Sequence, residues 1–332
     1  MWKEGHLMLL DTKDGTVQQL TSGYSSGESQ PAVSPDGQRI AFTAVHDQCD
    51  IVEIPLDGSG MQDLISTSRN EQSPSWSPNG NEILYAGERN GINGIWLTSL
   101  NEGWTRPVVT ERDVDQTAKI IFDSPSLSPD RQRVAYQANA SEIWVTNITG
   151  GNVVRLVSSQ YLADGPSWSA DENWIAFYSY STQGLAKVRV GSGSKPETIK
   201  EGLTSYIPRW SPNGEWITCV SADGLSLISP DGKKQRFISK GTWGPHTWSA
   251  DSSILYALQR QGDHVVLTSI DLKTLESKRI ADLGSSKGDY FGLSLSPDGK
   301  SLASSLLNYQ INIWMMEGFD QPAGFFARFR HN

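Results

Sequence analysis

A short phrase that recurs seven times along the chain constrains the fold more than any other feature of the sequence. Its commonest form ends in Ser-Pro-Asp-Gly or Ser-Pro-Asn-Gly, as at residues 31–37 and 74–80. The serine of the phrase recurs at positions 34, 77, 128, 169, 211, 249 and 296, so that successive copies lie 38 to 51 residues apart. A period of about 40–50 residues is typical of the four-stranded blade of a β-propeller.

Each part of the phrase has a physical role. Ser-Pro-Asp-Gly is turn chemistry, because proline presets φ, aspartate bonds back to the chain and glycine accepts a positive φ. A short strand with one large apolar residue precedes the turn, and a second apolar strand follows it, as at residues 174–177. We expect the large apolar residues to pack between neighbouring blades; they are Val33, Trp76, Leu127, Trp168, Trp210, Trp248 and Leu295.

A count of strands tests whether such a ring can close. Six complete repeats supply 24 strands, and segments at both ends bring the total to 29, one more than seven four-stranded blades require. The sequence therefore predicts an all-β, seven-bladed β-propeller of four-stranded antiparallel blades, forming a single domain over residues 1–332. Strands from both termini (6–20 and 293–315) would close the ring without a free sheet edge, ahead of a C-terminal tail at 318–332. Either 6–10 or 311–315 could complete the seventh blade.

The repeats resemble the TolB-like, WD-type propeller repeat, in which S-P-x-W-S-P-D-G is followed by a K/R-I-A-F strand. The resemblance extends over roughly residues 30–319. The closing segment 312–319, Asn-Ile-Trp-Met-Met-Glu-Gly-Phe, is similar to the end of propellers fused to bacterial winged-helix regulators or Ser/Thr kinases. The resemblance implies a binding or sensing module. TolB itself has six blades and a preceding small domain, so its own role does not carry over.

Composition narrows the classes of partner and site. The net charge of −9 and the pI of about 5.1 argue against a nucleic-acid surface, which needs clustered Lys and Arg. No apolar stretch is long enough to cross a membrane. Cys49 and Cys219 lie in different repeats, so neither a disulfide nor a zinc site is expected, and no cofactor is implied. The compartment is periplasmic or otherwise extracytoplasmic if the chain belongs to a larger parent, and cytoplasmic if it does not.

The candidate site lies at the mouth of the expected channel. The Ser-Pro-Asp-Gly turns occupy one face, so the loops that enter the first strands frame the opposite face. Residues just before the aligned prolines are half acidic and half aromatic, which suits a protein, a peptide end, a glycan or a cationic group. They are Glu28, Glu71, Gln72, Asp123, Asp164, Tyr206, Trp243, Tyr290 and Phe291. Arg209 and His246 directly follow aligned prolines, and we expect them to point toward the channel.

These features favour a non-enzymatic module that binds or senses a ligand, as part of a larger bacterial regulator. The alternative is an enzyme, a polysaccharide lyase or hydrolase, with its active site in the funnel. Such an enzyme needs a His-rich metal centre or paired carboxylates, and Asp123 and Asp164 come nearest to such a pair. The five histidines are scattered, and the G-x-S-x-G match around Ser25 lacks the strand-turn-helix setting of a nucleophile. We therefore predict no catalytic residue and no metal.

Overall fold

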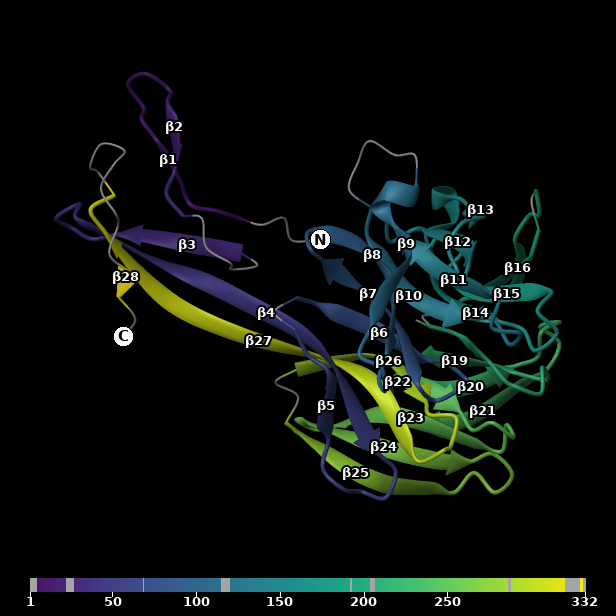
Figure 1. Cartoon of the computed structure of the whole chain (residues 1–332). Helices are drawn as coiled ribbons and strands as arrows, with labels where there is room; N and C mark the ends of the chain where they lie inside the picture. The colour runs from purple at the N-terminus through teal and green to yellow at the C-terminus, as the bar shows by residue number, and fades with distance from the viewer. Residues whose placement is uncertain are drawn as a thin grey trace. The chain divides into compact units, whose positions relative to one another are not determined.

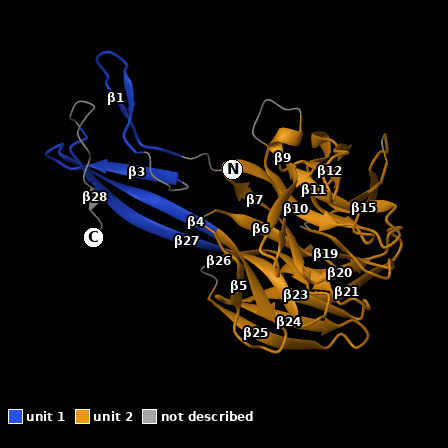
Figure 2. Ribbon diagram, viewed as in Figure 1, with its two compact units in different colours: residues 1–48, 307–332 blue, residues 49–306 orange. Residues whose placement is uncertain are grey.

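The computed structural model describes residues 5–21, 27–67, 69–114, 120–191, 193–203, 207–285, 288–319 and 329–330. In this part of the chain the secondary structure is β-sheet, apart from two three-residue 3-10 segments, η1 (Glu111–Asp113) and η2 (Ser159–Tyr161) (Figure 1). None of its helices could cross a membrane. The chain divides into two compact units, unit 1 (residues 1–48 and 307–332) and unit 2 (residues 49–306) (Figure 2).

Five four-stranded antiparallel sheets of unit 2 each come from one continuous stretch of chain, and each holds its strands in sequence order. This order is a meander, in which short turns join neighbouring strands. The strands are β6 (Glu71–Trp76), β7 (Glu82–Arg89), β8 (Ile92–Ser99) and β9 (Thr105–Thr110); β10 (Phe122–Leu127), β11 (Arg133–Ala138), β12 (Glu142–Asn147) and β13 (Val154–Val157); β14 (Ala163–Trp168), β15 (Trp174–Ser179), β16 (Gly184–Arg189) and β17 (Glu197–Glu201); β18 (Arg209–Trp210), β19 (Ile217–Ser221), β20 (Gly224–Ile228) and β21 (Gln235–Lys240); β22 (Thr242–Trp248), β23 (Ile254–Gln261), β24 (His264–Asp271) and β25 (Ser277–Ser285).

A further sheet joins the two ends of the chain. Its central strands are β27 (Ser301–Glu317) and β4 (Arg39–Pro55), flanked by β26 (Gly288–Leu295) and, along different parts of β4, by β5 (Gln62–Ile65) and β3 (Gly27–Val33). Closure by strands from both termini is therefore confirmed, as is the all-β class built from four-stranded antiparallel sheets. The described residues form seven sheets in all, a number consistent with seven blades.

The first repeat differs from the expected strand pattern. The strand pattern of a four-stranded blade predicts separate strands at 39–42 and 50–54, but both segments belong to the single 17-residue strand β4. Segments 301–306 and 311–315 likewise belong to the single 17-residue strand β27. Neither pair is separated by a glycine or proline turn, so nothing interrupts the extended backbone. The first repeat therefore shares the sheet of β27 rather than forming a meander of its own.

Unit 1 contains the remaining short strands. The hairpin β1 (Met8–Leu10) and β2 (Val17–Gln19) forms a two-stranded sheet, and β28 (Phe329–Arg330) pairs with the end of β27. Its small apolar core gathers Leu7, Ile40, Phe42, Ala44 and Met316. The expectation of one domain over residues 1–332 stays a prediction.

The turns that end the first strands owe their shape to the serine and aspartate of the phrase. Ser169 Oγ donates a hydrogen bond of 2.6 Å to Asp171 Oδ1 and accepts one of 3.0 Å from the backbone N–H of Trp174. The same pattern recurs at Ser249, with 2.6 Å to Asp251 and 2.9 Å from Ile254 N–H. Hydrogen bonds from the Ser249 and Ser253 hydroxyls lower the pKa of Asp251 to about 2, and hydrogen bonds from the side chains of Asn173 and Ser169 lower that of Asp171. The phrase is thus a self-contained local structure.

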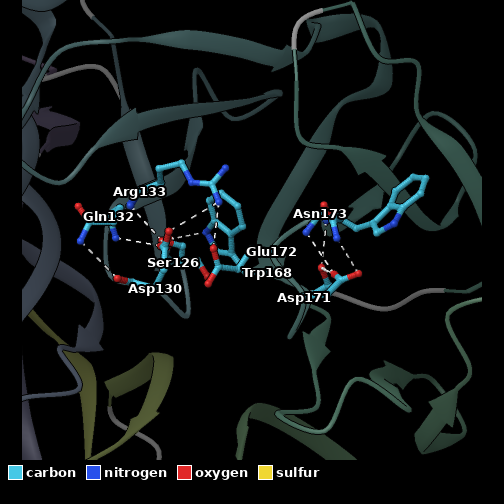
Figure 3. A network of polar contacts seen from close by, with 11 residues as sticks. Ser126, Asp130, Gln132, Arg133, Trp168, Asp171, Glu172 and Asn173 are labelled. Atoms are coloured by element: carbon cyan, nitrogen blue, oxygen red, sulfur yellow. Dashed lines mark hydrogen bonds and ion pairs between the residues drawn. The ribbon is translucent and has the colours of Figure 1, made fainter.

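Tryptophans of the phrase link neighbouring sheets, as expected. Trp168 is 6% exposed, and its Nε1 donates a 3.0 Å hydrogen bond to the carbonyl of Ser126 in the preceding sheet. Arg133 lies over the Trp168 ring at 4.8 Å and forms a 3.2 Å ion pair with Glu172 (Figure 3). The indole of Trp248 makes the same kind of bond, because its Nε1 donates a 3.1 Å hydrogen bond to the carbonyl of Arg209 in the preceding sheet. Trp168, Trp210 and Trp248 are buried, whereas Trp76 is only half-buried and Val33 is exposed.

Candidate functional site

The first strands of six sheets form a closed cycle in unit 2. Each of β6, β10, β14, β18, β22 and β26 packs against the next, and β26 packs against β6. We call this set of strands the first-strand ring. Most of the predicted site residues lie on it, because the start of the phrase lies within the first strand in β6, β10, β14, β22 and β26 and directly before it in β18.

A β-bulge recurs at the same place in these strands. The pairing register shifts between Gln72 and Ser75, between Asp123 and Ser126, and between Asp164 and Ser167. The residue just before each proline has positive φ: 56° at Ser73, 48° at Ser124 and 60° at Gly165. A bulge re-aims the neighbouring side chain and increases the local twist. The same bulge with a positive φ therefore occurs at the proline of β6, β10 and β14.

The bulges also bring neighbouring sheets into close contact. A Cβ at Gly165 would lie 2.7 Å from Ile207 Cα of the next sheet, and one at Gly292 would lie 3.1 Å from Ser73 Cα. At the latter junction Ser73 N–H donates a 2.7 Å hydrogen bond to Ser305 Oγ of β27. This close approach, rather than the positive φ alone, requires glycine at 165, because the equivalent serines at 73 and 124 also adopt a positive φ.

Glu71 is the most deeply buried of the predicted carboxylates, at 1% exposure. One of its oxygens, Oε1, accepts a hydrogen bond from the Thr67 hydroxyl. Within the described part of the chain, Oε2 has no hydrogen-bond partner. Burial raises the pKa of Glu71, opposed by the Thr67 hydrogen bond and by the charge of Arg89. Glu71 is thus a carboxylate whose charge is incompletely compensated.

Asp123 and Asp164 are partly exposed on adjacent first strands. Asp123 Oδ1 accepts a 2.6 Å hydrogen bond from Ser73 Oγ, and Asp164 Oδ2 accepts one of 3.3 Å from Tyr180 OH. Burial raises the pKa of both carboxyls, and the negative charge of Asp123 raises that of Asp164 further. These two residues are therefore close enough to repel each other.

Cys49 connects Glu71 with this pair. Burial raises the pKa of its thiol to about 12, and the negative charges of Asp50, Asp123 and Glu71 contribute to the rise. Glu71 and Asp123 therefore both act on this thiol, and Asp164 in turn interacts with Asp123. We call Glu71, Asp123 and Asp164 the acidic cluster.

Arg209 and His246 continue the ring beyond Asp164. Burial lowers the pKa of Arg209 to about 10, opposed by the negative charge of Asp164. His246 is 1% exposed, and its Nε2 lies 2.7 Å from Thr218 Oγ1. Burial, together with the charge of Arg209, lowers the pKa of His246 to about 4. Near pH 7 the guanidinium is therefore charged and the imidazole neutral.

The other predicted residues have different surroundings. Gln72 is partly exposed on β6, and Phe291 is 39% exposed on β26. Trp243 is buried in an apolar core, with Nε1 donating a 3.2 Å hydrogen bond to Lys240 O. Tyr290 packs beside an apolar cluster, and burial raises its pKa. Two of the expected stacking rings are thus used in packing.

Two predicted residues do not belong to the described ring. Glu28 lies in unit 1, where its carboxylate accepts hydrogen bonds from the Thr21 hydroxyl and, at 3.3 Å, from Leu7 N–H. His6 Nδ1 lies 3.8 Å from the same carboxylate. Tyr206 lies outside the described residues, as does Ser25 of the G-x-S-x-G match.

Sequence reasoning missed Cys49, Asp50 and Ser73. Sequence reasoning considers Cys49 only as a disulfide partner or a metal ligand, and neither Cys49 nor Asp50 belongs to the repeated phrase. Ser73 directly precedes an aligned proline, so its place in the phrase could have identified it. Among the described residues, no group of three or more His, Cys, Asp or Glu side chains is arranged to hold a metal ion.

Comparison with known proteins gives partial sequence matches. No protein-family model matches the chain. It is 29% identical over 122 residues to the Tol-Pal system protein TolB of Anaeromyxobacter dehalogenans, a match covering 36% of this chain and 26% of that protein. It is 27% identical over 216 residues to an uncharacterized peptidase, YuxL, of Bacillus subtilis, covering 60% and 31% respectively. The chain thus spans about a quarter to a third of these curated relatives.

Similarity to solved structures is more extensive. A protein of Agrobacterium tumefaciens provisionally assigned as TolB matches with a TM-score of 0.63 at 18% identity, over 80% of this chain and 99% of that chain. An oligogalacturonate lyase in complex with manganese matches with a TM-score of 0.53 at 14% identity, over 95% of this chain and 79% of the other. Together with the repeated four-stranded sheets, these similarities show that the chain has the fold of a TolB-like β-propeller.

Proposed function

We propose that this chain is a non-enzymatic β-propeller that binds a protein or peptide through the first-strand ring, as the sensor part of a larger bacterial regulator. The observation that carries the proposal is the acidic cluster beside Arg209, formed from successive sheets of the ring. Sites that draw polar groups from several elements are suited to binding one ligand. The matches to TolB proteins of the Tol-Pal system support a binding role over a catalytic one.

The acidic cluster favours a cationic group on the ligand. Carboxylates held near one another raise the local negative potential, and Glu71 and Asp164 both have raised pKa values because burial disfavours their charged forms. A lysine or arginine side chain offsets that cost, since it supplies N–H donors and a compensating charge. A polyanionic ligand, such as a uronate chain or a nucleic acid, would add repulsion.

Calorimetric titration with blocked short peptides tests this proposal. A lysine-containing peptide should bind, and a glutamate-containing peptide of the same length should not. Asp164→Asn should weaken lysine-peptide binding, whereas Asp63→Asn should not, because Asp63 is exposed on the outer strand β5. Equal binding of both peptides, or equal effects of the two variants, would contradict the assignment.

The enzymatic alternative has a separate assay. Oligogalacturonate should be neither bound nor cleaved, which can be followed by the ultraviolet absorbance of unsaturated elimination products. Cleavage of oligogalacturonate by this chain would replace the binding proposal with a lyase.

A further inference from the structure

Arg209 places a positive charge beside the acidic cluster. Its guanidinium lies near Asp164 of one neighbouring sheet and His246 of the other, as their mutual effects on pKa show. The side chain is half-buried, and it makes no hydrogen bond or ion pair with the described residues. Its backbone carbonyl is already used, accepting hydrogen bonds of 3.1 Å from Thr218 Oγ1 and from Trp248 Nε1. The backbone of Arg209 in β18 is thus held in place, whereas the N–H donors of its guanidinium are not used by the described residues.

Asp164 does not form an ion pair with Arg209. Its Oδ2 accepts the Tyr180 hydroxyl at 3.3 Å, and no ion pair joins it to Arg209. His246 cannot serve as a counter-charge because an imidazole is either neutral or positively charged. A guanidinium that is partly desolvated without a carboxylate partner is costly, and an incoming carboxylate could form a bidentate pair with it.

At the other side of the acidic cluster, a carboxylate oxygen of Glu71 lacks a hydrogen-bond donor among the described residues, whereas the Arg209 guanidinium lacks an acceptor among them. Glu71 is only 1% exposed, and its Oε2 has no hydrogen-bond partner in the described part of the chain. Buried carboxylate oxygens ordinarily have donors, so this oxygen is suited to an incoming N–H group. The same ring therefore holds an under-compensated anion and an under-compensated cation, separated by Asp123 and Asp164.

We propose that the site binds a bipolar peptide segment, in which a lysine or arginine side chain pairs with the Glu71 side of the acidic cluster and a carboxylate pairs with Arg209. This inference rests on the proposed peptide-binding function and narrows its ligand class. A ligand that bears both charges pairs with the Glu71 carboxylate and with the Arg209 guanidinium at the same time. A purely cationic ligand leaves the guanidinium unpaired and is repelled by it.

Three blocked peptide sets distinguish this inference from the broader function. One set carries a single lysine and a single aspartate one to four residues apart, one carries only the lysine, and one carries only the aspartate. We expect the best bipolar peptide to bind the wild-type chain about tenfold more tightly than the lysine-only peptide, consistent with a charge-assisted hydrogen bond. The aspartate-only peptide should bind weakest, because the acidic cluster repels it.

Variants assign the two charges to their partners. Arg209→Met should abolish the tenfold preference and should strengthen lysine-only binding, because the repelling charge is removed, and Arg209→Lys should retain the preference in part. Glu71→Gln should weaken both lysine-containing sets. The matched control is Arg236→Gln, on the outer strand β21, which should change nothing.

Each outcome has a defined meaning. Equal affinity of the bipolar and lysine-only peptides would overturn the bipolar inference but leave the peptide-binding function standing. Equal loss for every peptide in both Arg209 variants would also overturn it, because the residue would then act on folding alone. Absence of binding by all three sets would overturn the inference and the proposed function together.

Discussion

Acidification should destabilise this protein through His246. The imidazole is 1% exposed, with Nε2 2.7 Å from Thr218 Oγ1 and Nδ1 3.3 Å from Gly244 O. Burial, reinforced by Arg209, lowers its pKa from 6.5 to about 4. The unfolded chain therefore binds the proton more tightly than the folded chain, so stability contributed by this residue falls as the pH falls from about 6.5 to about 4.

The size of the effect follows from the shift. Each unit of pKa difference corresponds to about 1.4 kcal/mol, so the loss from His246 should reach about 2 kcal/mol at pH 5 and about 3 kcal/mol at pH 4. Urea unfolding at pH 7, 6 and 5, at constant ionic strength, measures it. The free energy of unfolding of wild type should approach that of His246→Gln as the pH falls, because the variant cannot bind this proton.

His264 provides a control of opposite sign. It is exposed, and its hydrogen bond and ion pair with Asp282 raise its pKa. Its stabilising contribution is complete below the unfolded pKa and is lost as the pH rises through the folded pKa. The gap between wild type and His264→Gln should therefore widen on acidification. A gap between wild type and His246→Gln that stays constant from pH 7 to pH 5 would refute the reasoning about the buried imidazole.

Three further changes have definite expected results. Glu71→Gln should raise the melting temperature at pH 7, because burial raises the pKa of Glu71 and so disfavours its charged form; a lower melting temperature would contradict this. Gly165→Ala should lower the free energy of unfolding in urea by about 1–3 kcal/mol, because φ is +60° and the added Cβ would lie 2.7 Å from Ile207 Cα. Gly103→Ala is the control: an added Cβ there meets no atom within 4 Å, so this variant reports the cost of the positive φ alone. Trp168→Ala should cost about 3–5 kcal/mol by the same measurement, and a loss below 1 kcal/mol would show that the indole does not link the sheets.

The fold was largely predictable because its information is local and repeated. The Ser-Pro-Asp-Gly turn needs only residues within a few positions of one another, as the bonds of Ser169 to Asp171 and Trp174 show. The apolar strands on either side of each turn follow the same logic. Burial of Trp168, Trp210 and Trp248 also follows from their common place in the phrase.

The candidate site was predictable only in part. The offset from the aligned proline selects Asp123 and Asp164, and the structure has these two residues on the adjacent strands β10 and β14. The same offset does not tell which way a side chain turns, because each strand bulges just before its proline. Trp243 and Tyr290 therefore pack among apolar residues rather than offering free faces.

The sequence by itself determined the all-β class, the repeated four-stranded sheet and the use of both chain ends in one sheet, since these follow from turn chemistry and period. The tertiary structure alone decided that residues 39–55 form one continuous strand, and that Glu28 and the first copy of the phrase lie in unit 1. It also decided that Cys49 lies beside the acidic cluster and that His246 is neutral. These features depend on which strands become neighbours and how far each side chain is removed from water, and no local pattern encodes either.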